Sequence, residues 1–157
     1  MQSNFIKRQI QELKQGDLKT FFRKFCALFF MALAAIFVIF IRLLRPFAVV
    51  RFGRLFSARI GHFAANTELY LCERDAGMRR PKTIDIFYHN PPVCNQQLKK
   101  MWDRRLHVFN FARWIDRCNR YLPGWDKQYE IELSSDLDFD NLFARIPAHL
   151  SFTAREG

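Results

Sequence analysis

Cysteine is scarce in this sequence, and no two cysteines stand close together. The 157 residues contain four cysteines, at positions 26, 72, 94 and 118, with no C-x-x-C pair. This spacing excludes a disulfide framework and a cysteine-based zinc pattern, and it is typical of a reduced compartment. We expect the four thiols to be structural, because scattered cysteines among apolar neighbours act as small hydrophobic residues.

Glycine is also sparse, and its placement excludes the common phosphate-binding motifs. The six glycines form neither the G-x-G-x-x-G dinucleotide fingerprint nor a P-loop. The acidic stretch 136–140 alternates aspartates like a metal-binding D-x-D motif, but it lacks the glycine and the distal glutamate of an EF-hand loop. It precedes a predicted helix, so we expect these acids to cap that helix, and we predict no metal site.

Acidic residues are too few to balance the basic ones, and the imbalance is uneven along the chain. The sequence has 25 Lys and Arg against 15 Asp and Glu, a net charge of +10. Residues 1–45 hold eight basic and two acidic residues, a net of +6, beside a long apolar run. Anionic lipid headgroups are the natural partner for charge in that place, whereas a nucleic-acid binder would distribute it differently. We therefore expect membrane lipid, and no nucleic acid, as a partner.

The apolar run, Phe25–Ile41, has 17 residues and no charge. As a helix extended to Leu44 it would be about 30 Å long, just enough to cross a bilayer. It predicts a membrane helix over residues 25–44, preceded by a basic amphipathic segment over residues 1–24. Nothing resembles a signal-peptide cleavage site. Basic residues flank the run on both sides, so a spanning helix and one that enters a single leaflet both remain open.

Residues 45–157 predict one α/β domain, with a Rossmann-like order of elements. A buried strand, 47–52, ends at Gly53, and a helix over 60–76 and a strand over 83–89 complete a βαβ unit. The later elements are a helix, a short third strand, a second helix, and a weaker strand and helix near the end, at 94–105, 106–109, 111–122, 129–133 and 140–145. In such sheets ligands bind at the carboxyl ends of strands, so we expect functional residues after Phe52 and His89.

Four segments carry a resemblance to a known family. They are RFGRLFSARIGHFAANTELYLCERDAG, PKTIDIFYHNPPVCNQQLKKMWDRRLHV, FARWIDRCNRYLPG and LFARIPAHLSFTAREG, and together they cover nearly all of 45–157. They resemble the amino-terminal portion of a bacterial family of predicted glycosyltransferases associated with surface-polysaccharide genes. The resemblance implies the amino-terminal lobe of a two-lobed, GT-B-like fold. It also implies a nucleotide-sugar donor as substrate, a glycan acceptor and no cofactor. Family members run on beyond this chain, so we expect a truncated lobe that needs a missing carboxy-terminal lobe or partner chain for activity.

The loop after the first strand and the start of the next helix hold the main candidates. Small residues at Gly53 and Gly61 would let backbone N–H groups approach a phosphate or sugar, although turn geometry alone also explains them. The resemblance offers His62 as the general base that takes a proton from the acceptor hydroxyl; the alternative is a histidine that only hydrogen-bonds backbone. Asn66 and Glu68 would orient sugar hydroxyls, unless Glu68 is an ordinary surface acid.

Arginines and a second strand end complete the predicted site. Arg51, with Arg54 and Arg59, surrounds the first loop and would bind pyrophosphate, an anionic acceptor or lipid headgroups; we favour Arg59 for substrate. His89 and Asn90 would shape the pocket at the end of the second strand, although turn chemistry also explains Asn-Pro-Pro.

The leading hypothesis is a membrane-associated glycosyltransferase, or its amino-terminal part. It would transfer sugar to a surface-glycan or lipid-linked acceptor at the cytoplasmic face of the inner membrane, where nucleotide sugars are available. The alternative is a non-catalytic, membrane-anchored interaction module that binds a partner through a sheet edge or an aromatic surface.

Overall fold

The structure is a computed structural model that describes residues 18–79, 83–125, 129–131, 133 and 137–154. Across these residues it is mixed α/β, with a small parallel sheet between helices, so the predicted α/β class is confirmed. Most of the predicted amphipathic segment, together with Asp136 of the acidic stretch, lies outside the described residues.

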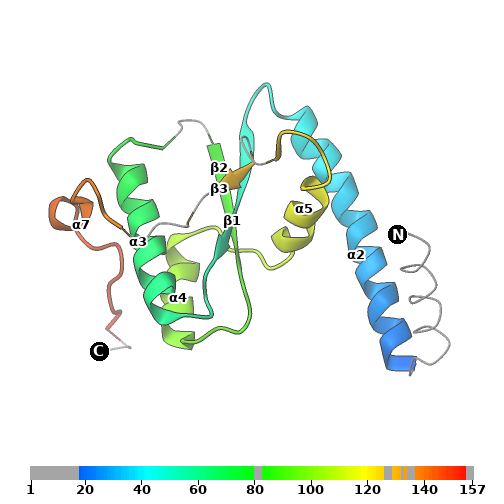
Figure 1. The fold of residues 1–157 in the computed structure, drawn as a ribbon, viewed down its shortest axis with the longest axis horizontal. Helices are drawn as coiled ribbons and strands as arrows, with labels where there is room; N and C mark the ends of the chain where they lie inside the picture. The colour runs from blue at the N-terminus through cyan, green and yellow to red at the C-terminus, as the bar shows by residue number, and fades with distance from the viewer. Residues whose placement is uncertain (1–17, 80–82, 126–128, 132, 134–136, 155–157) are drawn as a thin grey trace.

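Three parallel strands form the sheet, in the order β2-β1-β3 (Figure 1). They are β1 (Val49–Leu55), β2 (Thr83–His89) and the two-residue β3 (Glu130–Ile131). The prediction for β2 is confirmed to the residue, whereas the predicted third strand over 106–109 supplies a single bridge from Val108 to Phe87. After β1 the chain adds β2 on one side of it and later adds β3 on its other side. The direction in which strands are added therefore reverses at β1.

Helices cover both faces of the sheet. α3 (Ile60–Asp75) and α4 (Gln96–Arg105) lie over one face, and α5 (Ala112–Asn119) and the long α2 (Leu18–Leu43) over the other (Figure 1). Because side chains alternate along a strand, successive β1 residues enter different cores. Phe52 packs with α5 and α2, and Leu55 packs with α3 and α4.

Two helix starts are capped by side chains. The Asn95 carboxamide oxygen accepts a hydrogen bond from the Leu98 N–H at 2.9 Å and starts α4. The Asp138 carboxylate accepts hydrogen bonds from the N–H groups of Leu142 and Phe143, both at 2.8 Å, before the short α7 (Leu142–Arg145). The capping role predicted for the acidic stretch is therefore confirmed for Asp138.

α2 is long and apolar enough to cross a membrane, over Thr20–Leu43. One side of it packs on the domain: Ala34, Val38 and Ile41 are buried in the core shared with α5 and the sheet. At its end, Arg42 donates a hydrogen bond from Nε to the Asn119 side-chain oxygen at 2.9 Å. The opposite side is an exposed apolar stripe, formed by Phe21, Phe22, Phe25, Leu28, Phe29, Ile36, Ile39, Phe40 and Leu43.

The predicted end of the first strand is wrong. β1 does not stop at Gly53 but continues two residues further, to Leu55, because Gly53 pairs with Phe87 of β2 and Ile131 of β3. A Cβ at Gly53 would lie 2.5 Å from Cε1 of Phe87, so this glycine makes room for the Phe87 ring. It therefore serves sheet packing and does not lie in a ligand-binding loop.

Substituting alanine for this glycine should test that role. We expect Gly53→Ala to lower the free energy of unfolding by about 1–3 kcal/mol, because the added methyl group overpacks the core against Phe87 and Ile131. Gly61→Ala is the matched control, since a Cβ there meets nothing within 4 Å, and it should leave stability unchanged or raise it. Urea unfolding in detergent micelles measures both; equal stability of the two variants would contradict the packing role.

Candidate functional site

An open pocket of about 350 Å³ lies where the carboxyl ends of β1 and β2 meet the amino terminus of α3. Four predicted residues line it together with Phe56 and Ala58: Arg59, His62, Asn66 and Asn90. The two loops singled out from the sequence therefore form one concave surface. In parallel α/β sheets this is the edge at which ligands bind.

Hydrogen bonds hold the two loops of this pocket together. The fully buried Ser57 hydroxyl donates to the Asn90 carbonyl at 2.7 Å, and the Asn90 N–H donates to the Leu55 carbonyl at 3.2 Å. The Cys94 N–H in turn donates to the Ser57 carbonyl at 2.8 Å. Because each loop is tied to the other, the pocket is set by the fold before any ligand arrives.

The amino terminus of α3 supplies positive potential to the pocket. Arg59 precedes the helix in an extended conformation, and its side chain is exposed and makes no capping hydrogen bond to the helix start. The N–H groups of the first turn lack partners within the helix, and the aligned peptide dipoles add partial positive charge there. Together with the Arg59 guanidinium they favour an anionic group, such as a phosphate.

Asn66 lies in the wall of the pocket, one helical turn after His62. Its side chain is 3% exposed, and its Nδ2 donates to the Leu133 carbonyl. Its Oδ1 has no hydrogen-bond partner within the described part of the chain. A buried amide oxygen without a partner is costly, so it is a natural acceptor for a ligand hydroxyl.

The two histidines of the predicted site differ in their surroundings. His62 is half-buried in the pocket, beside the Phe56 ring at a centroid distance of 6.3 Å. His89 is buried outside the pocket lining, where its Nε2 lies 2.8 Å from a carboxylate oxygen of Asp103 and its ring meets Phe63 edge to face. Of the two, His62 is the one that a ligand in the pocket can contact.

Besides His89 and Gly61, three predicted residues lie outside the lining of this pocket. Gly53 packs under Phe87, as described above. Arg51 is 7% exposed in the middle of β1, where its Nε and one terminal nitrogen donate to the two oxygens of Asp85, at 2.8 and 2.7 Å. Glu68 lies on the outer side of α3, which contacts the segment after α7. The prediction that Arg51 surrounds the first loop is thus wrong, because β1 extends further than expected.

Arg51 and Asp85 form a buried network with Tyr70 on the α3 side of the sheet. The Tyr70 hydroxyl donates to the same carboxylate, and burial together with this hydrogen bond raises the pKa of the Tyr70 phenol. Burial by itself would raise the pKa of Asp85. The hydrogen bonds from Arg51 and Tyr70 outweigh that effect and hold the Asp85 pKa below its ordinary value. Asp85 is therefore charged in the folded protein.

Acid should weaken the fold through this carboxylate. Because the Asp85 pKa is lower in the folded state, its contribution is fully present above the ordinary aspartate pKa of about 3.9 and is lost as the pH falls toward the folded-state value. We expect the free energy of unfolding to fall with pH below about 4, and the fall to be shallower in Asp85→Asn. Urea unfolding between pH 2 and 6 measures this; parallel curves for the two proteins would contradict it.

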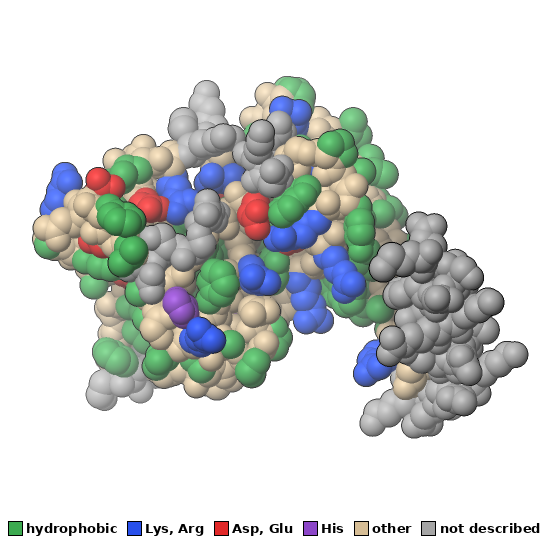
Figure 2. Space-filling view, in the orientation of Figure 1, with side chains coloured by type: hydrophobic (Ala, Val, Ile, Leu, Met, Phe, Trp, Pro, Cys, Tyr) green, Lys and Arg blue, Asp and Glu red, His purple; other side chains and the backbone are tan. Residues whose placement is uncertain are grey.

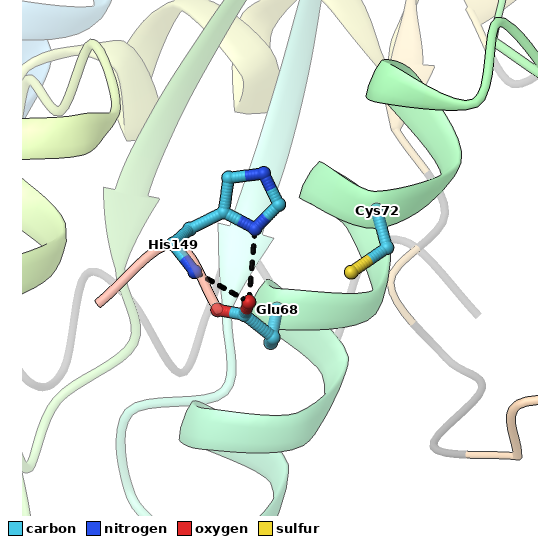
Figure 3. Close-up of side chains that lie close together, drawn as sticks. All are labelled: Glu68, Cys72 and His149. Carbon is cyan, nitrogen blue, oxygen red and sulfur yellow. Dashed lines mark hydrogen bonds and ion pairs between the residues drawn. The ribbon is translucent and has the colours of Figure 1, made fainter. Parts of the chain in front are cut away.

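The outer side of α3 carries a second cluster of ionisable groups (Figure 3). Glu68 accepts hydrogen bonds from the backbone N–H and Nδ1 of His149, at 2.8 and 2.9 Å, and the other ring nitrogen of His149 lies 2.9 Å from an Asp75 oxygen. Cys72 is buried next to them, one turn after Glu68. The i, i+4 spacing of Glu68 and Cys72 on a predicted helix was the available sequence signal, but nothing local indicates that His149 joins them.

Charge is distributed unevenly over the surface. Basic side chains spread across the middle of the face in Figure 2, whereas acidic side chains gather toward α7 and the adjoining end of α3. Around the Cys72 thiol, burial and then the carboxylates of Glu68, Asp138 and Asp75 raise the pKa. This acidic corner contrasts with the net charge of +10 on the whole chain.

Comparison of the chain with protein-family models, with curated proteins and with solved structures gave no match.

Proposed function

We propose that this protein is the amino-terminal part of a membrane-associated glycosyltransferase with a Rossmann-like lobe. The observation that carries the proposal is the grouping of Arg59, His62, Asn66 and Asn90 in one pocket at the carboxyl ends of two parallel strands. The reversal of strand order at β1 supports a Rossmann-like assignment, because ligands of doubly wound sheets bind at such a reversal.

The pocket contains the groups that sugar transfer requires. Arg59 and the start of α3 would neutralise a phosphate of the nucleotide-sugar donor or of a lipid-linked acceptor. His62 would take the proton from the attacking acceptor hydroxyl as the new C–O bond forms. Asn66, through the Oδ1 atom that has no partner among the described residues, and Asn90 would accept hydrogen bonds from sugar hydroxyls. A second lobe would close over this surface and complete the donor site.

We propose further that α2 lies in the plane of the inner membrane, with the domain at the cytoplasmic face. One side of α2 packs on α5, through contacts such as Phe30 stacked on Trp114 and Phe37 edge to face with Phe111. α5 also exposes Arg113 and Arg117, which hydrocarbon disfavours. Lipid therefore cannot surround this part of α2, and only the exposed apolar stripe would enter the bilayer.

Ligand binding tests the pocket. With UDP-glucose and GDP-mannose as probes, the purified chain in detergent micelles should bind at least one probe by isothermal titration calorimetry. Arg59→Ala should weaken that binding at least about tenfold, because it removes a charge-assisted hydrogen bond. Arg113→Ala, an exposed arginine on α5, is the matched control and should bind like the wild type. Failure of both probes to bind at millimolar concentration, or equal affinity in Arg59→Ala, would contradict the proposal.

Turnover tests His62. With the second lobe present and in membranes that supply the acceptor, transfer of radiolabelled sugar to the lipid-extractable fraction should fall about 10²–10⁴-fold in His62→Ala, while probe binding stays within a few-fold of wild type. His107→Ala, which changes an exposed histidine remote from the pocket lining, should retain activity. Full activity in His62→Ala would remove the base assignment, and tight binding of a protein partner without probe binding would favour the interaction module instead.

A further inference from the structure

The cluster on the outer side of α3 has the composition of a metal site. Glu68 and Cys72 come from adjacent turns of α3, and His149 comes from the segment after α7, 81 residues further along than Glu68. One carboxylate oxygen, the thiol sulfur and one ring nitrogen lie within 4.8 Å of one another. Figure 3 shows the three side chains converging between the helix and that segment.

The geometry suits a tetrahedral ion after small movements. Ligand atoms around zinc lie roughly 3.4 Å apart, given metal–ligand distances of about 2.0–2.3 Å. Glu68 and His149 are now closer than that, at 2.9 Å, because a proton joins them, and Cys72 is within reach. Replacing that proton by an ion would separate the oxygen from the nitrogen by about half an ångström, which side-chain rotation alone can supply.

The second ring nitrogen of His149 already has the partner that a metal-binding histidine needs. Nε2 lies 2.9 Å from the Asp75 carboxylate, so the imidazole can donate its proton there and direct Nδ1 toward Glu68 and Cys72. A carboxylate behind a histidine fixes the tautomer and the ring orientation in zinc sites. The side chains of His149 and Glu68 are 12% and 17% exposed, which leaves a route for an ion from solvent.

We propose that Glu68, Cys72 and His149 bind a divalent zinc-type ion, with solvent as the fourth ligand and Asp75 orienting His149. The mixture of one sulfur, one nitrogen and one oxygen donor favours zinc over calcium or magnesium, which prefer oxygen alone. On binding, the thiol proton passes to solvent, and the imidazole proton moves from Nδ1 to Nε2, where Asp75 accepts a hydrogen bond from it. The bound ion fastens the segment after α7 to α3. The surrounding carboxylates attract the cation although the chain as a whole is basic.

Metal titration of the purified chain tests this proposal. After treatment with a chelator, the protein should take up one equivalent of Zn²⁺ at micromolar concentration or below by isothermal titration calorimetry. Co²⁺ should give a thiolate-to-cobalt charge-transfer band in the near ultraviolet. Cys72→Ser should remove that band, and His149→Gln should weaken Zn²⁺ binding at least tenfold. Asp75→Asn should weaken it about 10–100-fold through the histidine.

Matched controls separate the site from other donors. Cys94→Ser and His107→Gln change an exposed cysteine and an exposed histidine outside the cluster, and both should bind metal like the wild type. Circular dichroism confirms the fold of each variant, and Glu68→Gln provides a second test if Cys72→Ser does not fold. Absence of one-equivalent binding, or binding that Cys94→Ser removes and Cys72→Ser and His149→Gln retain, would overturn the proposal.

Discussion

Replacing Arg51 by methionine should lower the free energy of unfolding by about 3–5 kcal/mol. The side chains of Arg51 and Asp85 are only 8% and 13% exposed, and two parallel hydrogen bonds join them. Methionine fills much of the same volume but leaves the Asp85 carboxylate buried with the Tyr70 hydroxyl and without its cation. Most of this loss in the free energy of unfolding comes from the uncompensated buried charge, and less from the lost contact. The loss therefore exceeds that of an ordinary surface substitution.

Arg54 provides the matched control for this prediction. It lies on the same strand but is exposed, so Arg54→Met should change stability by less than about 0.5 kcal/mol. The double variant Arg51→Met with Asp85→Leu should lose less stability than Arg51→Met alone, because it removes the orphaned charge. Urea unfolding followed by tryptophan fluorescence measures all three, and equal stability of Arg51→Met and Arg54→Met would show that the pair does not stabilise the fold.

Substituting serine for Phe29 and Phe40 should release the protein from membranes. These side chains are 61% and 58% exposed on the apolar stripe of α2, which we propose lies in the lipid. Each Phe that enters the hydrocarbon contributes about 1.5–3 kcal/mol, so the pair should shift partitioning about 10²–10⁴-fold toward water. Flotation with anionic liposomes, together with measurement of the fraction retained on isolated membranes, would show the change.

A second pair of phenylalanines tests whether the position matters or only the loss of apolar surface. Phe139 and Phe152 are 85% and 68% exposed but lie near the other end of the chain, so the same double serine substitution there should leave membrane retention unchanged. Retention of the wild type should also survive high salt, because burial of apolar surface is not screened. Release of the wild type by salt alone would contradict a hydrophobic attachment.

Local patterns were sufficient for most of the elements. The run of β-branched and aromatic residues from Thr83 to His89 predicts β2, and the helical spacing of apolar residues after Arg59 predicts α3. Each signal is local, because the residues that form it lie within a few positions of one another. Where the local signal was weaker, the predicted boundary was wrong. Gly53 indicated a turn at the end of β1, but it lies within the strand and makes room for the Phe87 ring. A glycine that ends a strand and one that admits a ring look alike in sequence.

The residues of the candidate site also fall into two groups, those whose place local patterns could predict and those whose partners depend on the tertiary structure. Arg59, His62 and Asn90 could be expected to meet, since they follow the carboxyl ends of two strands that a βαβ unit places side by side. The partner of Arg51 could not be predicted, because Asp85 is 34 residues away and the pairing depends on the register of β1 with β2. Glu68 was expected to face a sugar or solvent, and its contact with His149 depends on where the last described segment lies.

The sequence by itself determined that this chain is an α/β domain with a long apolar helix before it, because hydrophobic periodicity and turn residues act over a few neighbours. Only the tertiary structure decided which charges are buried together, which face of α2 is left exposed, and which thiol, carboxylate and imidazole converge on α3. Those outcomes depend on strand register and on helix packing, which join residues far apart in the chain. Contacts between such residues leave no pattern in the local sequence from which they could be predicted.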